Sequence, residues 1–387
     1  MAYDKVVDSA SLDSKLTQVA DAIRTKGNTS ADLQFPSGFI SAIQAIQTGT
    51  ELQIIVTVTS GATVTATKGS KVVSGTSVNG TCTLVVPEAG TWSVKATRNG
   101  KTSDTKSVTF TDRYAVALSF VSVVLNDNDW ATIKAVSDKG EGANYWSIGD
   151  RKEVTLNGTV GHLTLSNYTT YAFIIGFNHN SSLEGTNRIH FQLGKTALSG
   201  GTDVCLCDNQ YTPDNGWSSA GAGYFVMNAS DTNSGGWASS QMRTNICGTS
   251  LSSYSGTIIA VIPAALRAVL KFVTKYTDNT ANGGGSTASY VTATTDYFFL
   301  LSEYEVFGSI KYGNTNEKNK QAQYSYYSAG NSKIKYKHNG TSTDARWWLR
   351  SPCASYSSRF VFVNIDGKVY DYYNAYYSLG FAPGFCV

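Results

Sequence analysis

The 387-residue sequence contains few charged side chains and no run of basic ones. Lys, Arg, Asp and Glu together make up 15% of the chain, and the formal net charge is +3. Proteins that bind nucleic acid or anionic membranes through charge carry clustered Lys and Arg. The composition therefore argues against nucleic acid as a partner.

Long apolar segments are also missing. A transmembrane helix needs about 18 or more consecutive apolar residues, and the sequence has no such run. Residues 1–8 lack the apolar core of a secretory signal peptide. We therefore expect neither membrane insertion nor Sec-type secretion.

Cysteine and histidine form no recognisable catalytic or metal pattern. The six cysteines follow no disulfide-framework spacing, so we expect free thiols. Cys205 and Cys207 form a C-x-C pair without a second pair or a histidine cluster, so we interpret them as two thiols of one strand. The four histidines are dispersed, and neither H-E-x-x-H nor G-x-S-x-G occurs. The sequence predicts no enzyme, no cofactor and no metal site.

Residues 1–49 have the periodicity of helices. An apolar stripe recurs at four-three-four spacing through Leu12, Leu16, Val19 and Ile23. Gly27 marks the expected end of this helix, and a second apolar stripe follows Pro36. Such a short element cannot bury its stripes alone, so it must pack on its own domain, on sister chains or on another protein.

Residues 50–112 change to the period-two alternation of strands. Apolar alternation with Gly or Asn-Gly turns is visible at 54–58, 63–67, 82–86 and 92–96. Several short strands in about sixty residues predict an immunoglobulin-like β-sandwich or a related sandwich. Structural spacing is its expected role.

Residues 113–387 read as a mixed α+β domain. Asp129 is the predicted N-cap of a short helix that opens at Trp130, and a second helix is predicted over 239–246. Residues 282–286 read as a flexible Gly-rich loop, because no Walker Lys-Ser/Thr follows them. The rest consists of short strands between long Gly/Ser/Asn loops.

The segment from residue 353 to 379 is unusually rich in tyrosine. Six tyrosines lie there among Ser and Asn, which is the composition of antibody binding loops, where Tyr gives large contact area at low entropic cost. A Tyr-rich edge of an ordinary β domain is the alternative. The flanks look like fixed scaffold: we expect Trp347, Trp348, Leu349 and Phe385 to be buried and Arg350 to pair with an acid or with carbonyls.

The sequence Trp347-Trp348-Leu349-Arg350-Ser351-Pro352, with Asp366-Gly367 and a closing Gly-x-x-Pro, resembles the C-terminal signature of a family of phage and bacterial surface domains. These domains have a C-type-lectin-like fold related to the formylglycine-generating enzyme. Some are variable proteins of diversity-generating retroelements, in which adenine-targeted mutagenesis rewrites C-terminal codons. Further landmarks at 130–133, 145–150, 235–243 and 299–303 extend the resemblance over about residues 125–387. Relatives usually carry Arg in the closing turn, where this chain has Ala382.

The resemblance implies a variable region at about 346–387. An Asn codon mutated only at its adenines cannot become Trp, Met, Gln, Glu or Lys, and between Cys353 and Phe381 only Lys368 lies outside the reachable set. The enzyme relationship raises a copper-thiolate site through Cys353 and Cys386. We discount it because Cys353 lies where diversification would scatter residues.

We predict that the ligand-binding residues cluster on one exposed face. Strand alternation and a hairpin at Asp366-Gly367 bring the two arms of the segment together, and changing Tyr372, Tyr373 and Tyr376 together to Ser is expected to leave melting nearly unchanged. The predicted residues are Tyr356, Ser358, Arg359, Phe362, Asn364, Tyr370, Tyr372, Tyr373, Asn374, Tyr376 and Tyr377.

The N-terminal segment also resembles a known module. Residues 19–27, together with Phe35-Pro36-x-Gly38-Phe39, are similar to an N-terminal module of phage tail and tail-fibre proteins. The resemblances predict three parts: a tail-attachment or oligomerisation module (1–49), an immunoglobulin-like spacer (50–112) and a lectin-like binding domain (113–387).

Three functions fit this organisation. The first is a phage tail-tip receptor-binding protein, made in the host cytoplasm and carried in the virion. It would bind a host surface protein or glycan, contact tail proteins through residues 1–49 and form a homotrimer. The second is a bacterial surface adhesin or carbohydrate-binding module of fixed sequence, and the third is a structural tail or baseplate protein. The tail-like N-terminus favours the first over the second, and the tyrosines favour it over the third.

Overall fold

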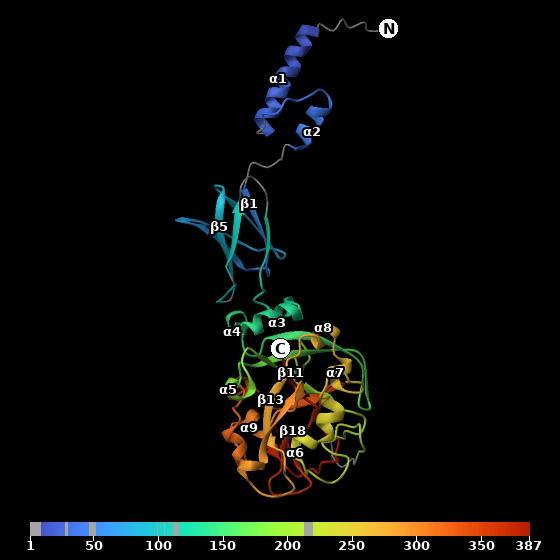
Figure 1. Cartoon of the computed structure of the whole chain (residues 1–387). Coiled ribbons are helices and arrows are strands. Elements are labelled where there is room, and N and C mark those ends of the chain that lie inside the picture. The colour runs from blue at the N-terminus through green and yellow to red at the C-terminus, as the bar shows by residue number, and fades with distance from the viewer. Residues whose placement is uncertain are drawn as a thin grey trace, which may run out of the picture. The chain divides into compact units, whose positions relative to one another are not determined.

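The computed structural model shows a multidomain chain of short N-terminal helices followed by several β-sheets (Figure 1). It describes residues 9–27, 30–45, 52–98, 100–103, 105–110, 116–212 and 220–387. Its contacts divide the chain into two compact units, one made of residues 1–96 and 105–119 and the other of residues 97–104 and 120–387. None of the helices in the described ranges is long and apolar enough to span a bilayer.

The predicted N-terminal helices are present as α1 (Ser9–Gly27) and α2 (Ser37–Ala45). α1 ends at Gly27, as expected. Ala20, Ile23 and Phe39 form a small core between the two helices. Leu12 and Val19, the other half of the predicted stripe, are 45% and 47% exposed. The short helix pair therefore covers one side of the stripe and leaves the other uncovered.

The predicted strands of the next segment are also present. β1 pairs with β4 antiparallel and with β8 in parallel, while β2, β3, β5, β6 and β7 form a second sheet. Burial alternates along β4 and β5 because successive side chains point to opposite faces. The strands are β1 (Leu52–Thr57), β2 (Thr63–Lys68), β3 (Lys71–Thr76), β4 (Thr81–Val86), β5 (Gly90–Arg98), β6 (Lys101–Thr102), β7 (Lys106–Phe110) and β8 (Val116–Ser119).

Between residues 120 and 387, the described part of the second unit mixes short helices with four sheets. Its strands are β9 (Arg151–Val160), β10 (Leu163–Phe177), β11 (Ile189–Lys195), β12 (Val204–Cys205), β13 (Val273–Asp278), β14 (Val291–Asp296), β15 (Phe298–Phe299), β16 (Lys335–Lys337), β17 (Gly340–Ala345), β18 (Trp347–Pro352), β19 (Phe360–Val363), β20 (Val369–Tyr370) and β21 (Gly384–Cys386). Its helical segments are η1 (Leu125–Asp127), α3 (Trp130–Asp138), α4 (Gly142–Tyr145), α5 (Ser181–Glu184), α6 (Gly236–Ser239), η2 (Met242–Cys247), α7 (Ile258–Val261), α8 (Ala264–Arg267), η3 (Ala288–Tyr290), α9 (Glu303–Phe307), η4 (Thr315–Asn319) and α10 (Ser325–Ser328).

The last strand of the chain lies inside the largest sheet of this unit. β21 pairs with β11 and β15 in the order β15-β21-β11-β10-β9. Just before it, the buried Ala382 carbonyl accepts a hydrogen bond from Gln192 Nε2 at 3.0 Å, and Tyr327 donates to Gln192 Oε1 at 2.6 Å. A neutral amide on β11 thus holds the closing turn at Ala382.

The predicted scaffold residues are buried. Trp347, Trp348, Leu349 and Phe385 have no measurable exposure. Both indole N–H groups are satisfied, since Trp347 Nε1 donates to the Lys333 carbonyl at 2.9 Å and Trp348 Nε1 donates to the Phe225 carbonyl at 3.1 Å. β18 is therefore a strand whose residues are all buried in the core.

Two local predictions have different outcomes. Asp129 caps α3 as predicted, since its Oδ1 accepts from the Thr132 N–H at 2.7 Å.

The prediction of a continuous helix over 239–246 is wrong, because α6 ends at Ser239 and a π-helix starts at Met242. Ser240 separates them with an extended backbone, donating its hydroxyl to the Trp237 carbonyl and accepting from the Arg243 N–H. Such local side-chain bonds compete with helix continuation.

The cysteines are free, as expected. Each of the six is buried and none forms a disulfide. The Cys205 and Cys207 sulfur atoms are 3.9 Å apart at β12, where burial raises the pKa of the Cys207 thiol well above its usual value. Both side chains therefore act as core thiols.

Replacing Trp347 with Ala should destabilise the second unit by about 3–5 kcal/mol, because it leaves a large cavity and an unpaired Lys333 carbonyl. Urea unfolding followed by fluorescence measures this. The control is Leu198→Ala, at a side chain that is 46% exposed, for which a change below about 1 kcal/mol is expected. Equal stability of Trp347→Ala and the native protein would contradict the central position of β18.

Candidate binding site

The tyrosine-rich segment starts and ends at the same place in the fold. The Gly380 N–H donates to the Arg346 carbonyl at 2.7 Å, and the Trp348 N–H donates to the Gly380 carbonyl at 3.1 Å. A Cβ on residue 380 would lie 2.2 Å from Cys205 Sγ, so this close approach requires glycine. The segment is therefore a loop whose two ends are joined by main-chain hydrogen bonds, and we call this joined part the closed base of the loop.

The two arms of the loop meet in the predicted hairpin. β19 pairs with β20, and Phe362 lies opposite Tyr370. The Asn364 N–H donates to the Lys368 carbonyl at 2.8 Å, and the Gly367 N–H donates to the Asn364 carbonyl at 2.9 Å. Gly367 has a φ of +74°, which favours glycine at this turn. The hairpin prediction at Asp366-Gly367 is confirmed.

Five tyrosines of the segment are in consecutive ring contact, and we call them the tyrosine ladder. Ring centroids are separated by 5.5 Å for Tyr370–Tyr372, 4.7 Å for Tyr372–Tyr373, 5.5 Å for Tyr373–Tyr377 and 4.7 Å for Tyr377–Tyr376. These separations are typical of favourable aromatic pairs. All five tyrosines follow the hairpin turn, and Phe362 on the other arm contacts three of them, Tyr370, Tyr372 and Tyr373.

The predicted site residues divide into an outer and an inner layer. Tyr356 and Tyr372 are exposed, at 48% and 42%. The half-buried members are Ser358, Arg359, Asn364, Tyr370, Asn374 and Tyr376. These eight residues form the outer layer and are accessible to a partner.

The expectation of exposure is wrong for Phe362, Tyr373 and Tyr377, which are buried at 0%, 3% and 7% exposure. Phe362 lies on β19, every residue of which is buried, and its ring is 5.0 Å from Tyr372 and 4.9 Å from Tyr373. Burial, with the neighbouring Tyr376 hydroxyl, raises the pKa of Tyr377 to about 12, so this phenol stays neutral. These three residues form the inner layer, which supports the ladder.

Arg359 connects the first arm of the loop to the second. Its guanidinium carbon lies 4.0 Å from the centroid of the Tyr356 ring, a cation–π contact. Its backbone bridges to Asn374, and the Ala375 N–H donates to the Ser358 carbonyl at 2.7 Å. Arg359 Nε is buried and has no hydrogen-bond partner in the described part of the chain.

Asn233 holds the first arm in place, a role that the sequence did not reveal. Its side chain is fully buried, and Nδ2 lies 2.7–3.1 Å from the carbonyls of Cys353, Tyr356 and Arg359. Its Oδ1 accepts from the Asn282 N–H at 2.9 Å. The only signal was its position two residues before the landmark at 235–243.

The Gly-rich loop at 282–286 is tied to the same arm, contrary to the prediction of a flexible loop. The Asn282 N–H is bound by Asn233, and the Gly285 N–H donates to the Ala354 carbonyl at 3.0 Å. Backbone hydrogen bonds to residues distant in sequence restrain these glycines. A local composition rule cannot show such bonds.

Below the loop, Arg350 pairs with an acid and with a carbonyl, as predicted. The fully buried guanidinium forms a two-point ion pair with Glu305 on α9, with Nη2 2.8 Å from Oε1. It also donates to the Leu300 carbonyl and to Thr277 Oγ1, both at 2.8 Å. Burial favours the neutral form of Glu305, but Arg350 and Lys275 together lower its pKa below the usual value. Both partners are therefore charged.

A cluster of His179, Glu184 and Glu305 has the spacing of a metal site. The buried Lys275 ammonium lies 2.5 Å from Glu184 Oε2 and 2.9 Å from Glu305 Oε1, and it also donates to the Tyr324 hydroxyl at 2.8 Å. A lysine cation therefore occupies the position between the carboxylates that a metal ion would take. The cluster is an internal charge network.

The discounted pair Cys353 and Cys386 lies at two separate places. Cys353 donates to Asp371 at 3.2 Å beside the loop, while Cys386 is 3.3 Å from His190 Nδ1 on β11. Burial raises the pKa of each thiol to about 12. These residues do not form a two-thiolate copper site.

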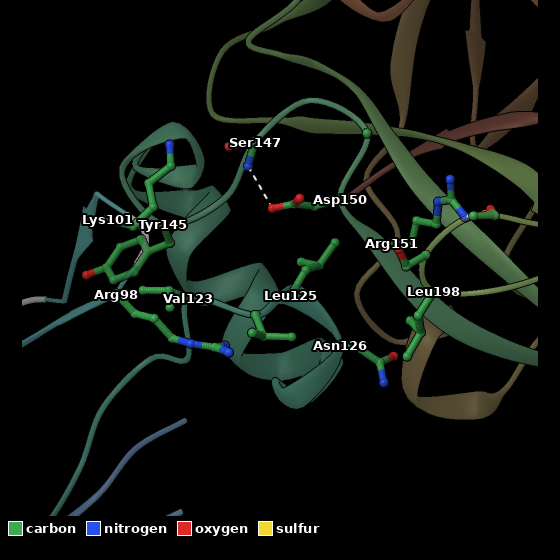
Figure 2. Close-up of a pocket in the computed structure, with 14 residues that line it drawn as sticks. Arg98, Lys101, Val123, Leu125, Asn126, Tyr145, Ser147, Asp150, Arg151 and Leu198 are labelled. Carbon is green, nitrogen blue, oxygen red and sulfur yellow. Dashed lines mark hydrogen bonds between the residues drawn. The ribbon is translucent and has the colours of Figure 1, made fainter. Parts of the chain in front are cut away.

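A larger cavity of about 450 Å³ lies elsewhere in the second unit (Figure 2). Figure 2 shows Arg98 and Lys101 on one side of it and Arg151 and Leu198 on the other. Arg151 donates to the Ala197 and Gly200 carbonyls, and the half-buried Asp150 accepts from the Ser147 N–H at 2.8 Å. None of the predicted binding residues lines this cavity.

The comparison with known families covers the loop and its scaffold. The model of a domain of unknown function, DUF6273, matches residues 223–387. This match spans less than half of the chain and includes Asn233, β18 and the tyrosine ladder. No curated protein is detectably similar to the chain.

Glu317 gives a pH test of the scaffold below the loop. It accepts from Ser351 Oγ at 2.7 Å and from the Asp278 N–H at 3.0 Å, and burial raises its pKa to about 7. In the unfolded chain a glutamate ionises near pH 4.3. The stability that comes from neutral Glu317 is therefore fully present below about pH 4.3 and is lost as the pH rises through about 7.

We expect Glu317→Gln to stabilise the protein relative to the native chain more at pH 8 than at pH 5, by roughly 2 kcal/mol. Denaturant unfolding at the two pH values measures this difference. The exposed Glu153→Gln is the control and should give the same change at both. A pH-independent effect of Glu317→Gln would show that Glu317 is ionised in the folded state.

Proposed function

We propose that this chain is a receptor-binding protein of a phage tail tip. In this proposal residues 1–49 attach it to the tail, residues 50–112 form an immunoglobulin-like spacer, and residues 113–387 form a C-type-lectin-like domain. The outer layer of the tyrosine segment binds a protein or glycan of the host surface. The protein is carried in the virion and performs no catalysis.

The observation that carries this proposal is the closed-base loop with accessible aromatic side chains. Tyr356 and Tyr372 keep 48% and 42% exposure although buried residues surround the loop's base. Exposed aromatic residues that cluster on one surface usually mark an interaction site. Tyrosine combines apolar area with a hydroxyl and has few rotatable bonds, so it binds at low entropic cost.

The arrangement of the layers also supports a diversified face. The outer-layer residues contribute side chains to the surface, whereas the main chain of the loop is held by Asn233, the Gly380 pairing and the hairpin. Substitutions in the outer layer therefore leave these main-chain bonds in place. Such a loop tolerates codon rewriting better than a loop held by its own side chains.

The alternatives differ in what they require of this surface. A structural baseplate protein needs the tyrosines to be covered by a neighbouring subunit, and an adhesin of fixed sequence needs a secretion route. The N-terminal helices favour attachment to another assembly, because Leu12, Val19, Ile40 and Ile43 are between 45% and 54% exposed. We therefore prefer the tail-tip function, with a homotrimer as the expected state.

Changing Tyr356, Tyr372 and Tyr376 together to Ser should abolish binding of the labelled full-length protein to whole bacterial cells, measured by flow cytometry over a panel of strains. The melting temperature should stay nearly unchanged because all three lie in the outer layer. This set replaces the one chosen from sequence, since Tyr373 is buried and Tyr373→Ser should lower the melting temperature.

The matched control changes Tyr171, Tyr304 and Tyr336, which are half-buried tyrosines outside the loop, to Ser. It should keep cell binding. Two results would contradict the binding face. One is an equal loss of cell binding in the control, and the other is a large fall in the melting temperature of the loop variant.

Deleting residues 1–49 should reduce the oligomeric state to a monomer, because the uncovered stripe of α1 is lost. Light scattering on the full chain and on residues 50–387 measures this. If the trimer persists after the deletion, residues 50–387 mediate the self-association. If the full chain is a monomer, residues 1–49 do not mediate self-association.

A further inference from the structure

A second, smaller cavity lies directly beside the tyrosine ladder. It has a volume of about 310 Å³ and is bordered by β20, by the hairpin turn at residues 367–369 and by the end of α9. This volume is at the low end of the range of roughly 300–1,000 Å³ for small-molecule pockets. It is large enough for one unit of a larger ligand.

Three lysines line this pocket: Lys311, Lys333 and Lys368. Lys368 is highly exposed, and its Nζ lies 3.4 Å from a carboxylate oxygen of Asp366. Within the described ranges, neither Lys311 nor Lys333 forms an ion pair with an acidic side chain. Their ammonium groups contact aromatic rings instead, with Lys311 4.7 Å from Tyr312 and Lys333 5.6 Å from Phe307. The pocket therefore has an excess of positive charge available to a ligand.

The remaining walls are aromatic, and one of them belongs to the ladder. Phe307 and Tyr370 line the pocket. Tyr370 also contacts Tyr372 at 5.5 Å and stacks on Phe362 at 6.3 Å. A ligand in this pocket would be continuous with a ligand on the outer layer, because both would contact the same tyrosine.

We propose that this pocket binds the anionic unit of a surface glycan, a sugar that carries a carboxylate or a phosphate. Lysine ammonium groups bind the anionic group by charge-assisted hydrogen bonds, and the Phe307 and Tyr370 rings pack on the apolar face of the sugar. The inference rests on the proposed binding function of the neighbouring ladder.

The pocket also separates a fixed from a changeable part of the surface. Lys311, Lys333 and Phe307 lie upstream of the proposed variable region at 346–387. Lys368 lies inside it, but it is the one residue between Cys353 and Phe381 that adenine-targeted rewriting of an Asn codon cannot produce. Lys311, Lys333 and Phe307 thus form a fixed part of the pocket, while Lys368 and Tyr370 border it from within the proposed variable region.

Isothermal titration of the full-length protein with glucuronic acid, glucose 6-phosphate and glucose tests the inference. We expect at least one of the two acids to bind about tenfold or more tightly than glucose, since a hydrogen bond to a charged group is worth about this factor or more. The affinity should fall as salt is raised. The acid that binds more tightly identifies the carboxylate or the phosphate as the natural group.

Lys311→Gln and Lys333→Gln should each weaken binding of the preferred acid by about tenfold, without changing the melting temperature. Lys318→Gln, at an exposed lysine outside the pocket, should leave binding unchanged. The triple Ser variant at Tyr356, Tyr372 and Tyr376 should still bind the acid even if it no longer binds bacterial cells. None of these three residues lines the pocket.

No binding of either acid, equal binding of glucose, or an equal loss in Lys318→Gln would overturn the proposal. These outcomes are distinct from a failure of the receptor-binding function. If the lysine variants bind the acids normally and the tyrosine variant no longer binds bacterial cells, the proposal of an anion subsite is wrong and the receptor-binding proposal stands. If the lysine variants weaken acid binding but the tyrosine variant still binds bacterial cells, the tyrosine ladder does not form the receptor-binding surface.

Discussion

The buried ion pair between Arg350 and Glu305 holds β18 against α9, and the tyrosine-rich loop starts from that strand. Removing one partner of a buried pair costs about 3–5 kcal/mol, because the other charge is left without compensation. Arg350 also donates to Thr277 on β13 and to the Leu300 carbonyl, so a single side chain connects three parts of the unit. A shift of β18 by one residue would move Arg350 to the opposite face of the strand. The pair therefore specifies the register of β18 and hence the place where the loop begins.

The base of the loop is fixed by main-chain hydrogen bonds, whereas the exposed side chains of the loop are held by fewer contacts. Its base depends on the Arg346–Gly380 pairing and on Asn233, which bind main-chain atoms. Its inner layer depends on Phe362, Tyr373 and Tyr377, which are buried. In the outer layer, Asn364 Oδ1 accepts from Arg346 Nε at 2.9 Å, while Tyr356 and Tyr372 keep 48% and 42% of their surface exposed.

The sequence was informative where structure depends on local pattern. Period-two alternation predicted the strands of residues 52–98, the Asp366-Gly367 dipeptide predicted the hairpin turn, and Asp129 was recognised as a cap. Paired tryptophans beside Arg350 predicted a buried strand with an internal charge partner. Each of these signals lies within a few residues of the feature that it predicts.

The errors and omissions involve contacts between residues that are distant in the sequence. Tyr372 and Tyr373 are chemically identical neighbours, and Phe362 packs against both of them. Tyr373 also contacts the buried Tyr377, and it is 3% exposed whereas Tyr372 is 42% exposed. Asn233 acts on carbonyls more than a hundred residues away. The pocket joins Lys311 and Lys333 to the hairpin turn, and no spacing rule connects these segments.

The central claim is that the outer layer of the loop is dispensable for folding, whereas its base and inner layer are not. A library with every residue from 346 to 387 substituted, sorted for protease resistance, measures the tolerance of each position directly. The account predicts that Tyr356, Ser358, Tyr372 and Tyr376 accept most substitutions, while Arg350, Phe362, Tyr373 and Gly380 accept few. If Tyr356, Tyr372 and Tyr376 prove as intolerant as Arg350, the tyrosines are part of the core and the account of a binding face is wrong.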